Sequence, residues 1–165
     1  MISEDYRELN RQLHNSNAAY GTSGHKFAQY VINLCKSYQT GDVLDYGCGK
    51  QTLNGAIEGL DVAGYDPCIT GLDEIPEPHD LVVCTDVMEH IEPEHLDAVL
   101  DDLRRVTRKA LFMTVATRPA KKVLADGRNA HLIQEDYTWW LPKIWKRFHV
   151  KQLLVSDGEF LVVAE

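Results

Sequence analysis

The chain has 165 residues, of which 44% are hydrophobic and 25% are charged, and its formal net charge is −8. This composition is typical of a globular protein with one domain, and it excludes a collagen-like or wholly disordered chain. No apolar run approaches the length of about 18 residues that indicates a membrane-spanning helix.

The N-terminus and the cysteines indicate the cellular compartment. The first ten residues, MISEDYRELN, lack the basic and then apolar arrangement of a signal peptide. The four cysteines, Cys35, Cys48, Cys68 and Cys84, form no C-x-x-C pair, and Cys35 and Cys84 lie within apolar runs. We therefore expect a cytoplasmic protein with free thiols rather than disulfides or a structural zinc site.

Positive charge is concentrated in residues 104–151. This segment contains twelve of the 17 lysines and arginines and only three acidic residues, so its charge is +9 and that of the remaining chain is −17. The overall charge argues against a protein that coats nucleic acid. A basic face that attracts an anionic substrate and a scattered distribution over the surface are both open alternatives.

The spacing of apolar residues predicts alternating helices and strands. Helical spacing occurs at 26–38, 53–60 and 96–106. Apolar runs typical of strands occur at 43–46, 62–65, 81–84, 110–115, 150–155 and 160–164. Residues 68–79 are loop-like, and an aromatic stretch lies around 139–148.

The order of these elements predicts an α/β fold. Strands that alternate with helices form parallel βαβ units, and strands that are apolar throughout belong to a sheet covered on both faces. Only residues 156–159 separate the last two strands, which is too short for a parallel crossover. We therefore expect a mostly parallel sheet with a C-terminal antiparallel hairpin.

A glycine-rich segment, Asp45-Tyr46-Gly47-Cys48-Gly49, follows the first strand and precedes the predicted helix at 53–60. Ligands bind at the carboxyl ends of strands in such sheets, and glycines let the backbone approach them closely. Asp66 follows Asp45 by 21 residues, at the end of the second strand, where an acid can accept hydrogen bonds from a ribose. The segment lacks the third glycine of a dinucleotide site and the G-K-[ST] of a P-loop.

These residues resemble the class I S-adenosylmethionine-dependent methyltransferases. Residues 43–49 resemble the first motif of that family, Gly64-Tyr65-Asp66-Pro67 the second, and residues 80–91 (DLVVCTDVMEHI) the motif of the fourth strand. The resemblance covers about residues 20–165. It implies a Rossmann-like methyltransferase sandwich in a single domain, residues 1–165, with residues 1–25 as an N-terminal lid segment.

The chain departs from the family pattern in two places. Gln51 stands where a third glycine is common, which predicts a tighter or remodelled turn. Only thirteen residues separate Asp66 from Asp80, so the usual third strand and its helices are expected to be shortened or lost. The adenine pocket is consequently the least defined part of the predicted site.

The resemblance implies S-adenosylmethionine as the cofactor. The implied contact residues are Tyr20, Asp45, Gly47, Cys48, Gly49, Asp66, Pro67, Asp86 and Val87. Gly47 and Gly49 would lie beside the methionine portion, Asp45 would hold its ammonium group through water, and Asp66 would hold the ribose hydroxyls.

Three of these contact residues are expected near the methyl group or at the entrance to the site. Asp86 and Val87 would lie beside the transferred methyl group, and Tyr20 would fold over the cofactor as part of the lid.

Methyl transfer to a hydroxyl or a protonated nitrogen also requires a base. His131, in a polar loop after the strand at 110–115, is the first candidate because histidine titrates near neutral pH. Glu89 and His90, which follow the strand at 81–84, are rival candidates. Arg128 could clamp a carboxylate or phosphate of the acceptor.

The segment Asp86-x-x-Glu89-His90 also resembles a metal-binding variant found in some ubiquinone-pathway O-methyltransferases. We favour the alternative in which Glu89 and His90 pack under the cofactor, and we predict no metal.

The aromatic stretch offers candidates for the acceptor pocket. Trp139 and Trp140, near the start of a helix, are candidates for its wall. Trp145 follows the helical spacing and is expected in the core.

The sequence thus predicts an S-adenosylmethionine-dependent methyltransferase for a small acceptor molecule, contacted by residues 1–25 and 117–142 and anionic if the basic segment forms one face. We expect no membrane or nucleic-acid partner. The alternatives are a nucleic-acid methyltransferase, a catalytically inert binding module with this fold and a small NAD(H)-dependent reductase. Asp86-Val87-Met88-Glu89 stands where many nucleic-acid amino-methyltransferases have Asn-Pro-Pro-Tyr.

Overall fold

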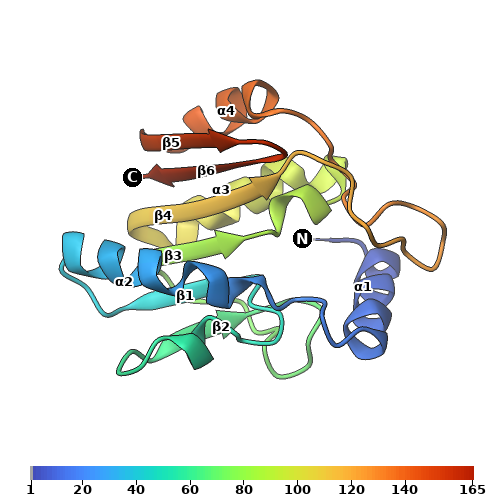
Figure 1. Ribbon diagram of the computed structural model, residues 1–165, viewed down its shortest axis with the longest axis horizontal. Coiled ribbons are helices and arrows are strands. Elements are labelled where there is room, and N and C mark those ends of the chain that lie inside the picture. The colour runs from blue at the N-terminus through green and yellow to red at the C-terminus, as the bar shows by residue number, and fades with distance from the viewer. Residues whose placement is uncertain (1) are drawn as a thin grey trace.

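A computed structural model describes residues 2–165, which form a six-stranded sheet with helices on both faces (Figure 1). The strand order is β2-β1-β3-β4-β6-β5. The strands are β1 (Val43–Tyr46), β2 (Val62–Tyr65), β3 (His79–Thr85), β4 (Thr107–Ala116), β5 (Val150–Ser156) and β6 (Glu159–Ala164). The first four are parallel, and β6 is antiparallel to both of its neighbours, β4 and β5. The predicted α/β class and the C-terminal antiparallel hairpin are confirmed.

The strands alternate their apolar side chains between two cores. Val43, Val83 and Phe112 pack with helix α2 (Ala28–Ser37) on one face. Leu44 and Val82 pack on the other face with α3 (Leu96–Val106) and α4 (Tyr137–Trp145). Because both faces are covered, the strands are apolar throughout, as the sequence predicted.

The segment between β2 and β3 contains no helix or strand at residues 66–78. The expected loss of the third strand of the methyltransferase pattern is therefore confirmed. The chain passes directly from the edge strand β2 to the central strand β3 through a loop.

The prediction of a helix at 53–60 is wrong, because this segment has only a short 3₁₀ turn at Asn54–Ala56. Leu53 and Ile57 are buried as the pattern required. Gly55 and Gly59 lower the helix propensity of this short segment, and Gly59 has a φ of +81°, which a right-handed helix does not contain. The glycine-rich segment consequently does not lead into an α-helix.

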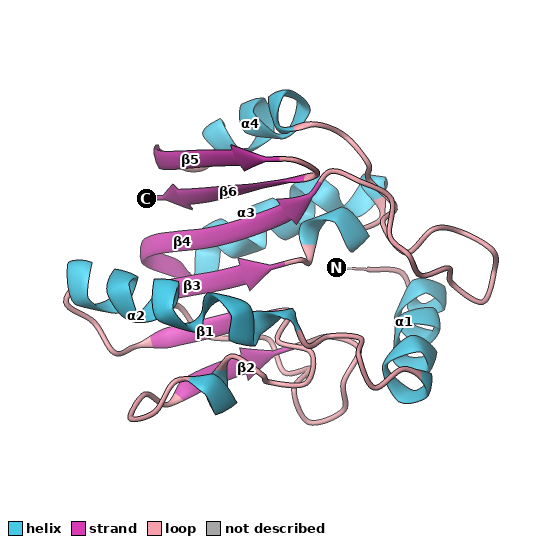
Figure 2. Cartoon of the chain, in the orientation of Figure 1, coloured by secondary structure: helices cyan, strands magenta, loops and turns pink. Residues whose placement is uncertain are grey.

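Helix α1 (Glu4–Ser16) lies near the carboxyl ends of the strands, apart from the sheet layers (Figure 2). Sequence reasoning did not predict it. Its N-cap is Ser3, whose side chain accepts a hydrogen bond from the Tyr6 backbone. The Ser3 backbone N–H and hydroxyl donate to Glu92, at 2.8 and 2.7 Å, and these bonds attach the start of α1 to the chain after β3.

Among residues 2–165, the cysteines are all free thiols. Cys35, Cys48 and Cys84 are buried and Cys68 is half-buried, so the prediction of free thiols is confirmed. No helix of the described chain is both long and apolar enough to span a bilayer.

The tryptophans of α4 differ from the prediction. Trp140 is completely buried, and its indole N–H donates to the Glu135 carbonyl at 3.1 Å. Trp145, expected in the core, is 58% exposed, so that prediction is wrong. The helix turns Leu141 and Ile144 toward the sheet instead.

This difference predicts unequal effects of two tryptophan substitutions. Trp140→Ala should lower the free energy of unfolding by about 3–5 kcal/mol, because it leaves a large cavity in the core. Trp145→Ala should change it by no more than about 0.5 kcal/mol, as is usual for an exposed site. Urea denaturation of both variants measures the difference, and equal losses would contradict the packing of α4.

Candidate functional site

A cavity of about 590 Å³ lies at the carboxyl ends of β1, β3 and β4. All of the residues that the sequence singled out for cofactor binding or catalysis line it, from Tyr20 and the glycine-rich segment to His131. Five separate stretches of the chain supply them. The structure therefore brings the candidates together, while their roles remain predictions.

The glycine-rich segment forms a tight turn after β1. Gly47 and Gly49 have φ values of +79° and +51°, and a Cβ atom on Gly49 would lie 2.5 Å from the carbonyl oxygen of Gly21. No side chain fits at that position, because the obstacle is backbone. Gln51 also has a left-handed φ, +55°, so the turn keeps a glycine-like conformation where the family commonly has its third glycine.

Asp66 fastens this turn to the end of β2. Its Oδ2 accepts a hydrogen bond from the Gly49 N–H at 3.0 Å, and its Oδ1 accepts one from the Cys68 N–H at 2.9 Å. The side chain thus shapes the turn in addition to facing the cavity, a role that sequence reasoning did not predict.

Asp45 and Asp66 are two buried carboxylates, 4% and 6% exposed. Burial, and then the charge of Asp66, raise the pKa of Asp45 to about 7. A cation bound beside these carboxylates would favour their ionised forms, so this part of the cavity suits a cationic ligand.

Tyr20 and Gly21 cover the turn from the N-terminal side. The Gly21 carbonyl accepts a hydrogen bond from the Lys50 N–H at 2.9 Å, and the Tyr20 hydroxyl donates to Asn10 of α1 at 2.8 Å. The Tyr20 ring contacts His14 edge-on, with centroids 4.6 Å apart. The segment expected to act as a lid thus contacts the cavity in this structure.

Helix α1 adds Tyr6, Asn10 and His14 to the cavity wall. The His14 Nε2 lies 4.0 Å from Asp66 Oδ2. The sequence offered no specific signal for these contacts, because they depend on how α1 docks over the ends of the strands.

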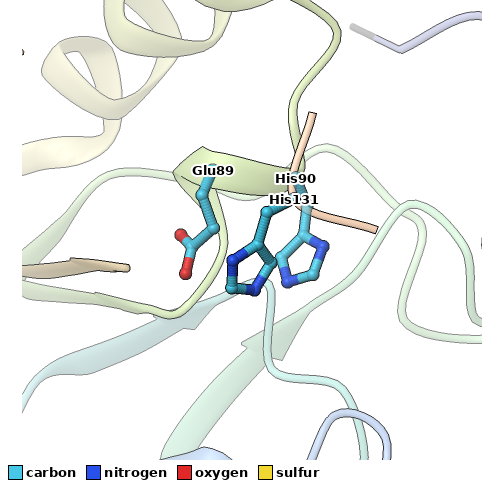
Figure 3. Close-up of side chains that lie close together, drawn as sticks. All are labelled: Glu89, His90 and His131. Atoms are coloured by element: carbon cyan, nitrogen blue, oxygen red, sulfur yellow. The ribbon is translucent and has the colours of Figure 1, made fainter. Parts of the chain in front are cut away.

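Glu89, His90 and His131 form a cluster in the cavity wall (Figure 3). Glu89 and His90 belong to a short turn after β3, and His131 comes from the loop that precedes α4. One side-chain donor atom from each residue lies within 4.8 Å of the others. Asp86 is not part of this group, and its Oδ1 accepts a hydrogen bond from the Thr114 hydroxyl at 3.2 Å.

The burial of this cluster changes its titration. Burial, and then the charge of Asp86, raise the pKa of Glu89 to about 8. Burial, and then the neighbouring His131, lower the pKa of His90 to about 4. Burial likewise lowers the pKa of His131.

Some basic residues of the segment 104–151 form salt bridges, and others line the cavity. Arg105, Arg108, Lys109, Arg128, Arg147 and Lys151 form salt bridges. Arg118, Lys121 and Lys122 line the cavity instead. The Lys122 Nζ lies 4.7 Å from the centre of the Tyr20 ring, a cation–π contact. Sequence reasoning did not single out these three residues.

Two groups of predicted acceptor contacts do not reach the cavity. Arg128 pairs with Asp126 at 2.7 Å and is not part of the cavity wall. Trp139 and Trp140 are also absent from that wall, so the prediction that they enclose an acceptor is wrong. The Trp139 ring instead forms a cation–π contact with Lys143, whose Nζ lies 3.5 Å from the ring centre.

Solved structures share the fold of this chain at low sequence identity. A 1,6-didemethyltoxoflavin-N1-methyltransferase from Burkholderia thailandensis, solved with S-adenosylhomocysteine, is 12% identical and has a TM-score of 0.72 over 99% of this chain and 90% of its own. The magnesium protoporphyrin IX methyltransferase of Synechocystis PCC 6803, also with S-adenosylhomocysteine bound, is 15% identical with a TM-score of 0.60 over 85% and 81%.

A third similar structure, the PH0226 protein of Pyrococcus horikoshii OT3, is 17% identical and has a TM-score of 0.63 over 85% of this chain and 89% of its own. The chain has the methyltransferase fold. No protein-family model and no curated protein sequence matches it.

The raised pKa of Asp45 predicts a pH-dependent effect of this residue on stability. An aspartate with a native pKa near 7 and an unfolded pKa near 4 stays protonated in the folded protein while the unfolded chain ionises. The free energy of unfolding should therefore fall as the pH rises from about 4 to 7.

Asp45→Asn removes this titration, so the variant should be more stable than the native chain at pH 8 and similar to it at pH 4. The difference at pH 8 should not exceed about 4 kcal/mol. Thermal unfolding of the ligand-free proteins from pH 4 to 8 measures it. A difference independent of pH would contradict the burial of a charged Asp45.

Proposed function

We propose that the protein is an S-adenosylmethionine-dependent methyltransferase that acts on a small molecule. The observation that carries this proposal is the convergence of the glycine turn, Asp45 and Asp66 on one cavity at the carboxyl ends of the strands. The bound S-adenosylhomocysteine in two structures of similar fold supports the same choice of cofactor.

The charges of the cavity support a cationic cofactor. S-Adenosylmethionine carries a sulfonium and an ammonium group, and Asp45 supplies a buried carboxylate for the ammonium, through water. Because Asp66 already accepts two backbone hydrogen bonds, its remaining lone pairs are those available to the ribose hydroxyls. Gly47 and Gly49 line the cavity and would present backbone rather than side chains to the methionine portion.

We assign the part of the cavity lined by Glu89, His90 and His131 to the acceptor. Arg118, whose carbonyl accepts a hydrogen bond from His131, gives this part a positive charge, which supports a small anionic acceptor. The magnesium protoporphyrin IX and didemethyltoxoflavin enzymes of similar fold act on small molecules, which agrees with this assignment. The basic residues that form surface salt bridges provide no continuous face for a nucleic acid.

The bound cofactor supplies an electrophilic methyl group, and the protein contributes mainly by positioning the acceptor. Asp86 and Val87 would lie beside the methyl group, and Glu89, His90 and His131 would lie beside the acceptor. The Nδ1–H of His90 donates to the Ala130 carbonyl at 2.7 Å and that of His131 to the Arg118 carbonyl at 2.6 Å. Each Nε2 atom therefore has a free lone pair and can take up a proton from the molecule that is methylated.

Binding of the cofactor is tested by calorimetry with S-adenosylhomocysteine and with NADH. We expect one molecule of S-adenosylhomocysteine per chain and no binding of NADH. Binding of NADH alone would favour a reductase, and binding of neither would contradict the cofactor assignment. Methyl transfer from labelled S-adenosylmethionine to a panel of small acceptors then separates an enzyme from an inert module.

Asp66→Asn should weaken S-adenosylhomocysteine binding by about 5- to 150-fold, which corresponds to about 1–3 kcal/mol. The new amide nitrogen cannot accept hydrogen bonds from the ribose or from the turn. The matched control is Asp61→Asn, at the exposed opposite end of β2. Equal affinities for the native chain and both variants would contradict the ribose assignment.

His131→Ala should reduce turnover with a responsive acceptor by at least about 100-fold, the usual contribution of a positioned proton acceptor. Cofactor affinity should change little, because His131 lies on the acceptor side. His149→Ala, on an exposed histidine far from the cavity, is the control. An unchanged rate in His131→Ala would remove this residue from the reaction.

A further inference from the structure

The cluster of Glu89, His90 and His131 has the donor atoms of a metal site. Two imidazole nitrogens and one carboxylate oxygen lie within 4.8 Å of one another. A tetrahedral ion with bonds of about 2.0–2.1 Å separates its ligands by about 3.4 Å, so the three side chains need to draw together by at most about 1.4 Å. The residues come from two segments, 41 positions apart, that the fold places side by side (Figure 3).

Backbone hydrogen bonds orient both imidazoles for metal binding. The Nδ1–H of His90 donates to Ala130 at 2.7 Å, and that of His131 donates to Arg118 at 2.6 Å. A proton on Nδ1 leaves the lone pair of Nε2 available. Metal-binding histidines in proteins usually donate their second ring N–H to a carbonyl or carboxylate in this way.

The carboxylate of Glu89 supports a metal site independently of the two histidines. Its side chain is 0% exposed, and its Oε1 accepts a hydrogen bond from the Ala116 N–H at 3.0 Å. Its Oε2 is buried without a hydrogen-bond partner among the described residues. Such an atom is costly unless something pairs with it, and a bound cation would satisfy it.

We propose that Glu89, His90 and His131 bind one divalent transition-metal ion, such as Zn²⁺, Mn²⁺ or Co²⁺. Two imidazoles with one carboxylate suit these ions, whereas Mg²⁺ and Ca²⁺ prefer oxygen ligands. His131, and not Asp86, supplies the third ligand. Three protein ligands leave coordination positions open toward the cavity, as in catalytic rather than structural metal sites.

The open positions give the ion a role in the proposed methyl transfer, and this consequence rests on the proposed function. Because the ion then occupies the Nε2 of His131, it replaces that imidazole as the group that activates the acceptor. A hydroxyl of the acceptor that binds the ion loses its proton to solvent more readily, because the metal lowers its pKa. The oxygen then forms a bond to the methyl carbon, and the electron pair of the breaking carbon–sulfur bond remains on sulfur. The acceptor class is thus a small molecule with a hydroxyl that can ligate the ion.

The test uses the full chain without a polyhistidine tag, stripped with a chelator and titrated with Zn²⁺, Mn²⁺, Co²⁺ and Mg²⁺ in a calorimeter. We expect one transition-metal ion per chain and much weaker binding of Mg²⁺. Visible absorption bands of bound Co²⁺ report nitrogen ligands in the native chain and need no variant. No binding of the three transition-metal ions at millimolar concentration would overturn the proposal.

Variants locate the ion. Glu89→Gln, which can keep the bond from Ala116, and His131→Ala should each weaken Co²⁺ or Zn²⁺ binding by at least about 10-fold. His149→Ala should bind like the native chain. Equal affinity in the native chain, Glu89→Gln and His131→Ala would overturn the proposed ligands.

Calorimetry with S-adenosylhomocysteine on the stripped protein separates this proposal from the proposed function. Cofactor binding with no metal binding would overturn the metal site alone. Metal binding with no cofactor binding would leave the site standing and contradict the methyltransferase assignment.

Discussion

The close approach of the Gly49 and Gly21 backbones determines the shape of the cavity. A side chain at Gly49 would collide with the Gly21 carbonyl, so the turn after β1 and the N-terminal segment can meet only where neither residue has a Cβ atom. Asp66 holds the same turn from the other side through the Gly49 N–H. The ends of β1 and β2 and the chain leading from α1 are thereby joined around one space, and the other features of the site are arranged around it.

Both buried carboxylates and basic side chains line this space. Among the carboxylates are Asp45 and Asp66, and burial keeps their interaction strong because water screens it little. Arg118 and Lys122 are basic and come from the loop after β4. A cationic cofactor beside the two carboxylates and an anionic acceptor beside Arg118 would each find complementary charge.

The sheet could be predicted from the sequence because its strands are buried on both faces and therefore apolar without interruption. The acid at position 66 was also recognisable, since its distance from Asp45 follows from the length of one βαβ-like unit. The helical spacing at 53–60 gave a wrong prediction. Leu53 and Ile57 are buried without an α-helix, because glycines interrupt the segment. The proximity of His131 to Glu89 depends on how the loop before α4 folds, and no local pattern encodes it.

The proposed methyl transfer requires an adenosyl sulfur compound to lie against the turn of Gly47 and Gly49. A crystal structure of the protein with S-adenosylhomocysteine tests this most directly. We expect the ribose hydroxyls within hydrogen-bond distance of Asp66, the methionine portion along the glycine turn, and the sulfur facing the cluster of Glu89, His90 and His131. Occupancy of another part of the molecule, with this cavity empty, would contradict the account.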